Sequence, residues 1–193
     1  MKRAIFILLL ALCVVSRHEA HAQRALPRMR SIELRGGMVD GFCTSASTDA
    51  GYYFGVAMSR YAKHADKWVF GVEYLSHYYP YKAGRIPMAQ FTAEGGYYYK
   101  FFADPSHTFL FYVGGSAMTG YETVNWGDKR LYDGATIRNR DRFLYGGAVT
   151  LEVEAYLTDR IILSLSGCER CLWGTTTGHF HTQYGIGVKF IIN

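Results

Sequence analysis

Apolar and polar side chains alternate with a period of two along a segment that runs from Arg142 to Thr158. One set of alternate positions is apolar and comprises Phe143, Tyr145, Gly147, Val149, Leu151, Val153, Ala155 and Leu157. The other set holds most of the polar side chains and comprises Arg142, Leu144, Gly146, Ala148, Thr150, Glu152, Glu154 and Tyr156. Because successive side chains of a β-strand point to opposite faces, this segment predicts one long strand with one face suited to hydrocarbon.

The same alternation recurs along most of the chain. The segments are Arg30–Val39, Gly51–Ala62, Lys67–Tyr78, Met88–Phe102, Thr108–Glu122, Arg142–Thr158, Arg160–Leu172 and Phe180–Ile192. Short polar turns follow the second, fourth and sixth segments, and longer connections follow the odd-numbered ones. This alternation of short and long connections is typical of membrane barrels, whose short turns face the periplasm. The chain is therefore predicted to be all-β, an eight-stranded antiparallel up-and-down β-barrel of the outer-membrane type.

The polar face of these segments carries both charges and glycines. The charged positions are Glu33, Arg35, Glu73, Glu94, Lys100, Glu152, Glu154, Arg170 and Lys189. Acids and bases nearly balance in this set, and an eight-stranded barrel is only wide enough for its own side chains. The charges therefore predict a structural ion-pair network that fills the lumen and fixes the strand register, so an open pore is not expected.

A soluble barrel would show the same alternation with its apolar face turned inward. The alternative interpretation is therefore a periplasmic soluble β-barrel that binds a ligand or a protein partner. Two features favour the membrane barrel instead. Glycines lie mostly among the charges, where a narrow interior needs small residues, and 16 Tyr, 12 Phe and 3 Trp would overfill the core of a small soluble barrel.

The N-terminal residues 1–22 predict a cleaved secretory signal peptide, which leaves residues 23–193 as a single β-barrel domain. A basic start precedes the apolar segment Ile5–Leu12, and Ala20–Ala22 forms an A-x-A cleavage site. The apolar segment is too short to cross a bilayer as a helix. The formal net charge of +5 gives only weak support to a nucleic-acid or anionic-lipid partner.

Export would place Cys43, Cys168 and Cys171 in an oxidising compartment. Cys168 and Cys171 are three positions apart, so on one strand they face opposite sides and cannot pair without distortion. Pairing of Cys43 with either of the other two and three free thiols both remain open interpretations.

Residues with catalytic or metal-binding chemistry are few. The candidates for an outer-membrane lipid-modifying enzyme, a third interpretation, are His77, Ser116, Asp133 and His179. Their spacing specifies no catalytic set. The motif Gly178–His181 places two histidines on one strand face, without a Cys, Asp or Glu at matching short spacing. We therefore predict no enzymatic activity and no catalytic, cofactor-binding or metal-binding residue.

The longest connection, from Thr123 to Asp141, mixes charges with aromatic side chains. Exposed Trp, Tyr and Arg are enriched at the centres of protein interfaces. The candidate partner-docking residues in this loop are Trp126, Lys129, Arg130, Tyr132 and Arg138. The loop is either such a docking site or an ordinary solvated connection.

Four stretches of the chain carry a resemblance to a known family. Phe91–Tyr99, Gly120–Gly127, Tyr132–Thr136 and Gly178–His181 closely resemble the conjugative transposon protein TraO family. The resemblance extends over essentially the whole mature chain, and these motifs are specific in combination. It implies a role in DNA transfer between bacterial cells, and it supplies no catalytic or metal-binding residue.

Together, the barrel pattern and the resemblance predict an outer-membrane component of a conjugative mating apparatus in a Gram-negative bacterium. The predicted role is that of a structural anchor or docking barrel. Its expected partners are outer-membrane lipid and other conjugative transfer proteins. Direct contact with nucleic acid is not expected, because no basic groove with stacking aromatic residues is evident, and no small-molecule substrate is indicated.

Overall fold

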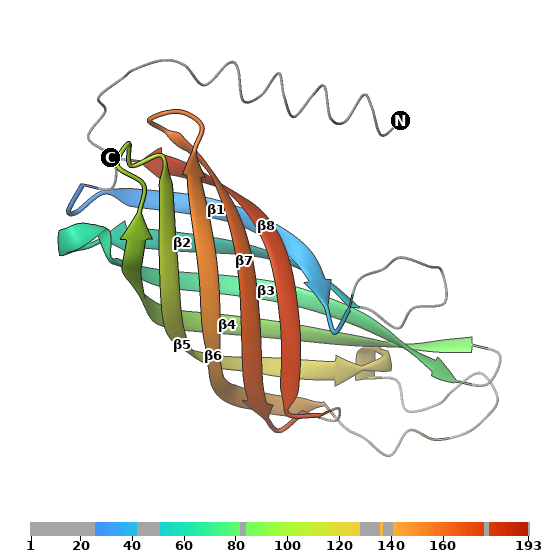
Figure 1. Cartoon of the computed structure of the whole chain (residues 1–193). Coiled ribbons are helices and arrows are strands. Elements are labelled where there is room, and N and C mark those ends of the chain that lie inside the picture. The colour runs from blue at the N-terminus through green and yellow to red at the C-terminus, as the bar shows by residue number, and fades with distance from the viewer. Residues whose placement is uncertain are drawn as a thin grey trace, which may run out of the picture.

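Eight antiparallel strands close into one barrel, in which each strand pairs with its neighbours along the chain and β8 pairs with β1 (Figure 1). The computed structural model describes residues 26–41, 51–81, 84–127, 136, 141–175 and 178–192. The strands are β1 (Arg30–Val39), β2 (Gly51–Tyr61), β3 (Lys67–Tyr81), β4 (Gly84–Ala103), β5 (Phe109–Val124), β6 (Arg142–Tyr156), β7 (Ile161–Trp173) and β8 (Phe180–Ile192). The 3₁₀ turns η1 (Lys63–Ala65) and η2 (Asn125–Gly127) follow β2 and β5. The predicted all-β, up-and-down barrel is confirmed.

The hairpin between β3 and β4 differs from the prediction. The alternation ends at Tyr78 and resumes at Met88, whereas the two strands pair as far as Tyr81 and Gly84. Backbone hydrogen bonding does not need an apolar face, so strand pairing continues where the period-two pattern stops. Each strand also carries a proline in this region, which lacks the N–H of a regular ladder and hides the extension from sequence analysis. The expected long connection is therefore a protruding β-hairpin (Figure 1).

The two ends of the barrel differ in their connections (Figure 1). The turn end holds the start of β1, the end of β8, and the connections 62–66, 104–108 and 157–160. The loop end holds the connections 40–50, 82–83, 125–141 and 174–179. Short and long connections therefore segregate to opposite ends, apart from the tight hairpin between β3 and β4.

Apolar side chains cover the outside of the barrel, and polar side chains fill the inside. Val72 and Leu151 point outward and are 59% and 60% exposed, whereas Glu154, Arg170 and Lys189 are fully buried. This arrangement is the reverse of that in a soluble barrel, which turns its apolar face inward. It matches the outward apolar band of barrels that lie in lipid. No helix within the described ranges is long and apolar enough to cross a membrane.

Inward glycines make room for larger side chains in the lumen. A Cβ atom on Gly114 would lie 2.6 Å from the ring of Tyr98. A Cβ atom on Gly96 would lie 2.6 Å from the Ser116 Cβ and 2.7 Å from the Gly115 carbonyl oxygen. Gly115 itself points outward, and a Cβ atom there would meet nothing within 4 Å. The glycines of the polar face thus leave the space that the larger inward side chains fill.

We expect Gly96→Ala to lower the free energy of unfolding by about 1–3 kcal/mol, the usual cost of overpacking a filled interior. The matched control is Gly115→Ala, which adds the same methyl group to open space and is expected to change stability by less than about 0.5 kcal/mol. Urea unfolding of the refolded barrel in detergent micelles, followed by tryptophan fluorescence, measures both values. Equal losses in the two variants would contradict a tightly packed lumen.

Candidate functional site

Two lysines and two glutamates form the centre of a buried cluster in the turn-end half of the lumen. Glu152 and Glu154 lie two positions apart on β6, so both point inward. Lys67, the first residue of β3, places its Nζ 2.9 Å from Glu152 Oε1 and 2.5 Å from Glu154 Oε1. Lys189 on β8 places its Nζ 2.7 Å from Glu154 Oε1 and also pairs with Glu152. Each lysine therefore contacts both carboxylates.

Tyrosine side chains complete the surroundings of this cluster. The Tyr61 hydroxyl donates to the Glu154 carboxylate, with an O–O distance of 3.0 Å to Oε2. Lys67 Nζ lies 4.1 Å from the centre of the Tyr112 ring, within the range of a cation–π contact. The ammonium group is thus enclosed by two carboxylates and an aromatic face, which compensates for the water lost on burial.

Two arginines form a second layer of ion pairs nearer the loop end. Arg35 on β1 pairs with Glu94 on β4, and its Nη2 lies 2.8 Å from Glu73 Oε1 on β3. Arg170 on β7 places its Nη1 3.5 Å from Glu73 Oε2 and donates from Nη2 to the Thr92 hydroxyl at 2.9 Å. Glu73 on β3 therefore links two arginines that project from β1 and β7, the two strands that flank β8.

The two layers together cross the lumen and close it. Glu33 on β1 accepts a hydrogen bond from the Ser164 hydroxyl at 2.6 Å and lies 3.5 Å from Lys189 Nζ. The ion pairs join β1, β3, β4, β6, β7 and β8 across the interior. A cavity among these residues measures only about 20 Å³, and one between Arg170 and the loop end about 10 Å³, room for roughly one water molecule each. This part of the lumen therefore has no space for a solute.

One predicted lumen charge lies apart from the network. Lys100 is half-buried near the turn end, and within the described residues its side chain makes no ion pair. Its backbone N–H donates to Asp66 Oδ1 at 2.9 Å. The pairing of β4 with β5 shifts register between Lys100 and Phe102, and this irregularity lies at the mouth of the barrel. The other predicted charges all take part in the ion pairs described above.

A separate group of polar contacts lies at the loop end. His181 Nδ1 lies 2.6 Å from Asp40 Oδ2, which ties the beginning of the 40–50 connection to β8. Asp40 has a φ of 58°, in the left-handed region that Asp tolerates better than most residues. Gln90 Nε2 donates to Glu122 Oε2 at 2.8 Å inside the same end of the barrel. These contacts fix the rim on which the longer connections stand.

The candidate catalytic residues do not form a set. His77 on β3 and Ser116 on β5 both face β4, which lies between these two strands. His77 pairs with Met88 of β4, and Ser116 pairs with Gly96, eight residues further along. Eight residues along a strand correspond to about 26 Å, so the histidine and the serine lie at different heights. His179 precedes β8 and uses its Nδ1 on the Leu172 carbonyl, 3.1 Å away. Asp133 lies outside the described residues, and the described part of the chain contains no group of three His, Cys, Asp or Glu arranged for a metal.

The predicted docking loop is described only at its beginning. Trp126 lies in η2, directly after β5, and its side chain is 65% exposed. The other candidate docking residues, which lie outside the described residues, are Lys129, Arg130, Tyr132 and Arg138. Trp126 therefore stands at the loop end with most of its ring available for contact.

The two described cysteines lie on opposite sides of the β7 wall. Cys168 shares the inward face of β7 with Arg170, and Cys171 lies on the outward face. Both are free thiols, and Cys43 lies outside the described residues.

A family model described as conjugative transposon protein TraO matches residues 26–192. The chain belongs to the TraO family. A comparison with curated proteins gives no significant match. The match covers the whole barrel, so the barrel and its lumen are those of a TraO-family protein.

Solved structures similar to this TraO-family chain are outer-membrane barrels. One of them is Ail, the attachment invasion locus protein of Yersinia pestis, crystallised with the heparin analogue sucrose octasulfate. It superposes with a TM-score of 0.57 at 8% identity, and the match covers 86% of this chain and all of Ail. Neisserial surface protein A has a TM-score of 0.53 at 13% identity, over 84% of this chain and 95% of its own. At such low identities the likeness shows the fold alone.

Sequence analysis missed several members of the buried cluster. Lys67 was treated only as the start of a strand, although it shares the parity of Glu73 on β3, which is the signal that could have placed it inward. Several inward tyrosines are also not expected from the pattern, because the inward face is predicted from its charges and glycines. These are Tyr61, Tyr98 and Tyr112, and all three are almost fully buried.

We expect Lys67→Met to lower the free energy of unfolding by about 3–5 kcal/mol, because it leaves two buried carboxylates with one fewer cation. The matched control is Lys63→Met on exposed η1, for which less than about 0.5 kcal/mol is expected. Adding Glu152→Gln to Lys67→Met should restore part of the loss, since it removes the unbalanced charge. Urea unfolding in micelles measures all three, and independent, additive effects of the two cluster substitutions would contradict the ion pair.

Proposed function

We propose that this TraO-family protein is exported by cleavage after Ala22, folds into the outer membrane and acts there as an anchor for other proteins of a conjugative apparatus. The observation that carries the proposal is the closed barrel with an apolar outside and an ion-paired, filled inside. Such a barrel holds a fixed position in lipid without conducting solutes. The process in the proposal, conjugative transfer, comes from the membership of a conjugative transposon family.

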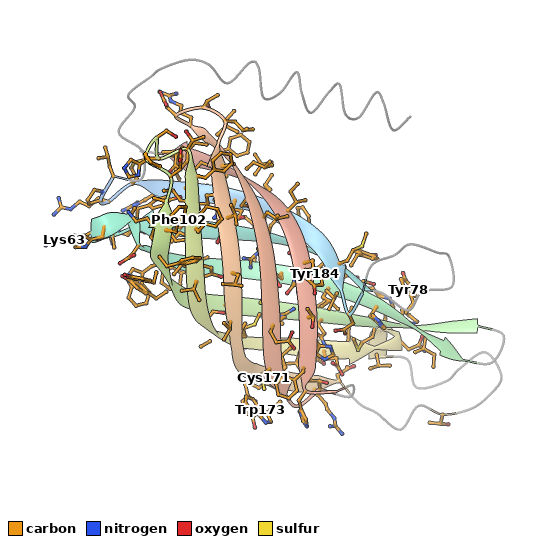
Figure 2. The ribbon with its side chains drawn as sticks, in the orientation of Figure 1. Lys63, Tyr78, Phe102, Cys171, Trp173 and Tyr184 are labelled. Atoms are coloured by element: carbon orange, nitrogen blue, oxygen red, sulfur yellow. The ribbon has the colours of Figure 1, made fainter. Side chains whose placement is uncertain are left out.

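Aromatic side chains at both ends of the outward face support the membrane placement. Near the turn end, Trp68 and Tyr97 meet edge to face, with ring centres 5.0 Å apart. At the loop end, Tyr145 stacks on Trp173 at 6.2 Å. Figure 2 shows Trp173 at the loop end of the barrel and Phe102 at the turn end. Tyr and Trp concentrate where a bilayer meets water, so two such groups bracket the hydrocarbon.

The filled lumen supports an anchoring role over a conducting one. Lys67, Lys189, Arg35 and Arg170 are held by carboxylates that extend from several strands. Opening the lumen would separate these buried charges from their partners, which costs several kcal/mol per ion. DNA would therefore pass elsewhere in the apparatus, and this protein would contribute contacts through its ends.

The loop end is the proposed docking surface for another transfer protein. Trp126 offers a large exposed ring beside a loop that combines Lys129, Arg130, Tyr132 and Arg138. Aromatic residues and arginine give the strongest contacts at protein interfaces. The β5–β6 loop is also the longest connection at that end. The loop end would face outward and the turn end the periplasm, as in barrels of this class.

Membrane fractionation tests the location. The full-length protein is expected in the outer-membrane fraction, and the unheated sample should migrate faster on gels than the heated one, because a detergent-resistant barrel stays compact. Recovery in the periplasmic fraction without this shift would instead support a soluble barrel with a ligand or partner.

Transfer assays test the docking role. Combining Trp126→Ala with Arg130→Ala should lower the frequency of DNA transfer at least about tenfold, as expected for the loss of two strong interface contacts. Phe180→Ala is the matched control, because Phe180 is also an exposed aromatic residue at the loop end, 70% accessible. All variants must retain the heat-dependent gel shift. Normal transfer by the double variant would remove this loop from the mechanism.

A further inference from the structure

Two arginines face each other across the first two strands, on the outside of the barrel at the turn end. Arg30 on β1 is the register partner of Arg60 on β2. Both side chains point outward and are exposed. Like charges placed directly opposite destabilise an antiparallel pair, so this pairing does not serve the fold. Among the described residues, neither guanidinium has an ion-pair partner.

The surrounding backbone adds positive charge to this pair. Arg28 is held beside the end of β2 by a hydrogen bond from its N–H to the Tyr61 carbonyl oxygen, 2.9 Å away. Lys63 projects from η1 at the same end of the barrel, away from the wall (Figure 2). The neighbouring β6–β7 turn carries Asp159 beside Arg160 and so adds no net charge. The outside of β1 and β2 is therefore cationic where it meets the turn end.

The arginines lie in the same cross-strand row as the turn-end aromatic residues. Arg60 is the register partner of Trp68 on β3, and Trp68 is that of Tyr97 on β4. The Tyr97 hydroxyl donates to Asp66 Oδ2 at 2.8 Å, which directs its polar tip toward the turn end. The strands are tilted, so this row is inclined: it reaches β8 at Thr182 near the loop end, whereas Arg30 itself pairs with Ile192 at the turn end. Arg60 and Arg30 therefore lie nearer the turn end than Trp68 and Tyr97. Because Trp and Tyr take positions at the headgroup level, the two arginines lie at that level or on its turn-end side.

Apolar side chains continue from the arginines toward the middle of the barrel. On β1 the next outward residues are Ile32 and Leu34, which are 40% and 46% exposed. On β2 they are Met58 and Val56, which are 45% and 38% exposed. A ligand that fits this strip has an anionic end at the arginine row and an apolar body that follows the strands.

We propose that Arg30 and Arg60 bind the phosphate of an anionic phospholipid from the periplasmic leaflet, whose acyl chains lie along Ile32, Leu34 and Met58. Arginine binds phosphate through paired N–H donors, and two arginines at one height can hold one phosphate between them. Basic residues at a membrane surface favour anionic lipids in general. This inference rests on the membrane placement proposed above, and it adds a lipid partner at the turn end.

Quenching of Trp68 by brominated lipid tests the proposal. The mature chain carrying Trp126→Phe and Trp173→Phe retains Trp68 as its only tryptophan, directly beside Arg60. It is refolded into phosphatidylcholine vesicles that contain a small fraction of either brominated phosphatidylglycerol or brominated phosphatidylcholine. We expect the anionic lipid to be enriched at least about fivefold over the zwitterionic one next to Trp68. Adding Arg30→Gln and Arg60→Gln should reduce this ratio to about one.

Three controls separate the outcomes. Arg142→Gln, at the exposed loop-end start of β6, should leave the ratio unchanged, and an equal fall there would overturn a specific site. Displacement of brominated phosphatidylglycerol by soluble polyglutamate would assign the arginines to an acidic protein and overturn the lipid proposal. A ratio of anionic to zwitterionic lipid of about one, measured in the single-tryptophan chain that retains both arginines, would also overturn the lipid proposal. Absence of quenching by either lipid would instead indicate failed insertion, which contradicts the membrane placement itself.

Discussion

Buried charge is the constraint on which the rest of this barrel depends. Lys67, Lys189, Arg35 and Arg170 lie inside the lumen, away from bulk water, and each needs carboxylates within contact distance. Most of those carboxylates come from strands that are not adjacent, with Lys67 of β3 reaching Glu152 and Glu154 of β6. The charges are therefore satisfied only when the sheet is closed. An open or misregistered sheet would leave them without partners, so the network selects one closure.

The same alternation that places charges inside places hydrocarbon outside, and this links lumen chemistry to membrane position. A strand that turned Glu152 outward would turn Val149 and Leu151 into the lumen. This would cost free energy on both faces, because the charge would lose its partners and the apolar side chains would lie among charges. Close packing of inward tyrosines over inward glycines then leaves little free volume. An apolar outer surface and a filled interior thus follow from one periodic pattern and not from two separate features.

Local pattern was sufficient for the strands and their faces but not for the contacts between them. The bounds of β1 and β8 match the predicted segments, because most residues there obey the period of two. The link between Lys67 and Glu154 could not be derived in this way, since it depends on which strands face each other across a closed cylinder. The extension of β3 to Tyr81 was missed for the opposite reason: backbone pairing there leaves no apolar signature. The proposed docking role of Trp126 rests on residue type and exposure, because a loop carries no periodic signal.

A filled lumen moves any function of the protein to its surfaces, and the two ends offer different chemistry. The loop end presents Trp126 and a ring of polar contacts such as His181 with Asp40, which suits recognition of another protein. The turn end presents Arg30 and Arg60 beside Trp68, and within the part of the chain that the structure describes neither arginine has an acidic partner. Inside the barrel, arginines are neutralised by glutamates that the fold supplies. Outside it, no carboxylate of the described residues pairs with Arg30 or Arg60, so in the proposed membrane placement the headgroup layer would neutralise them.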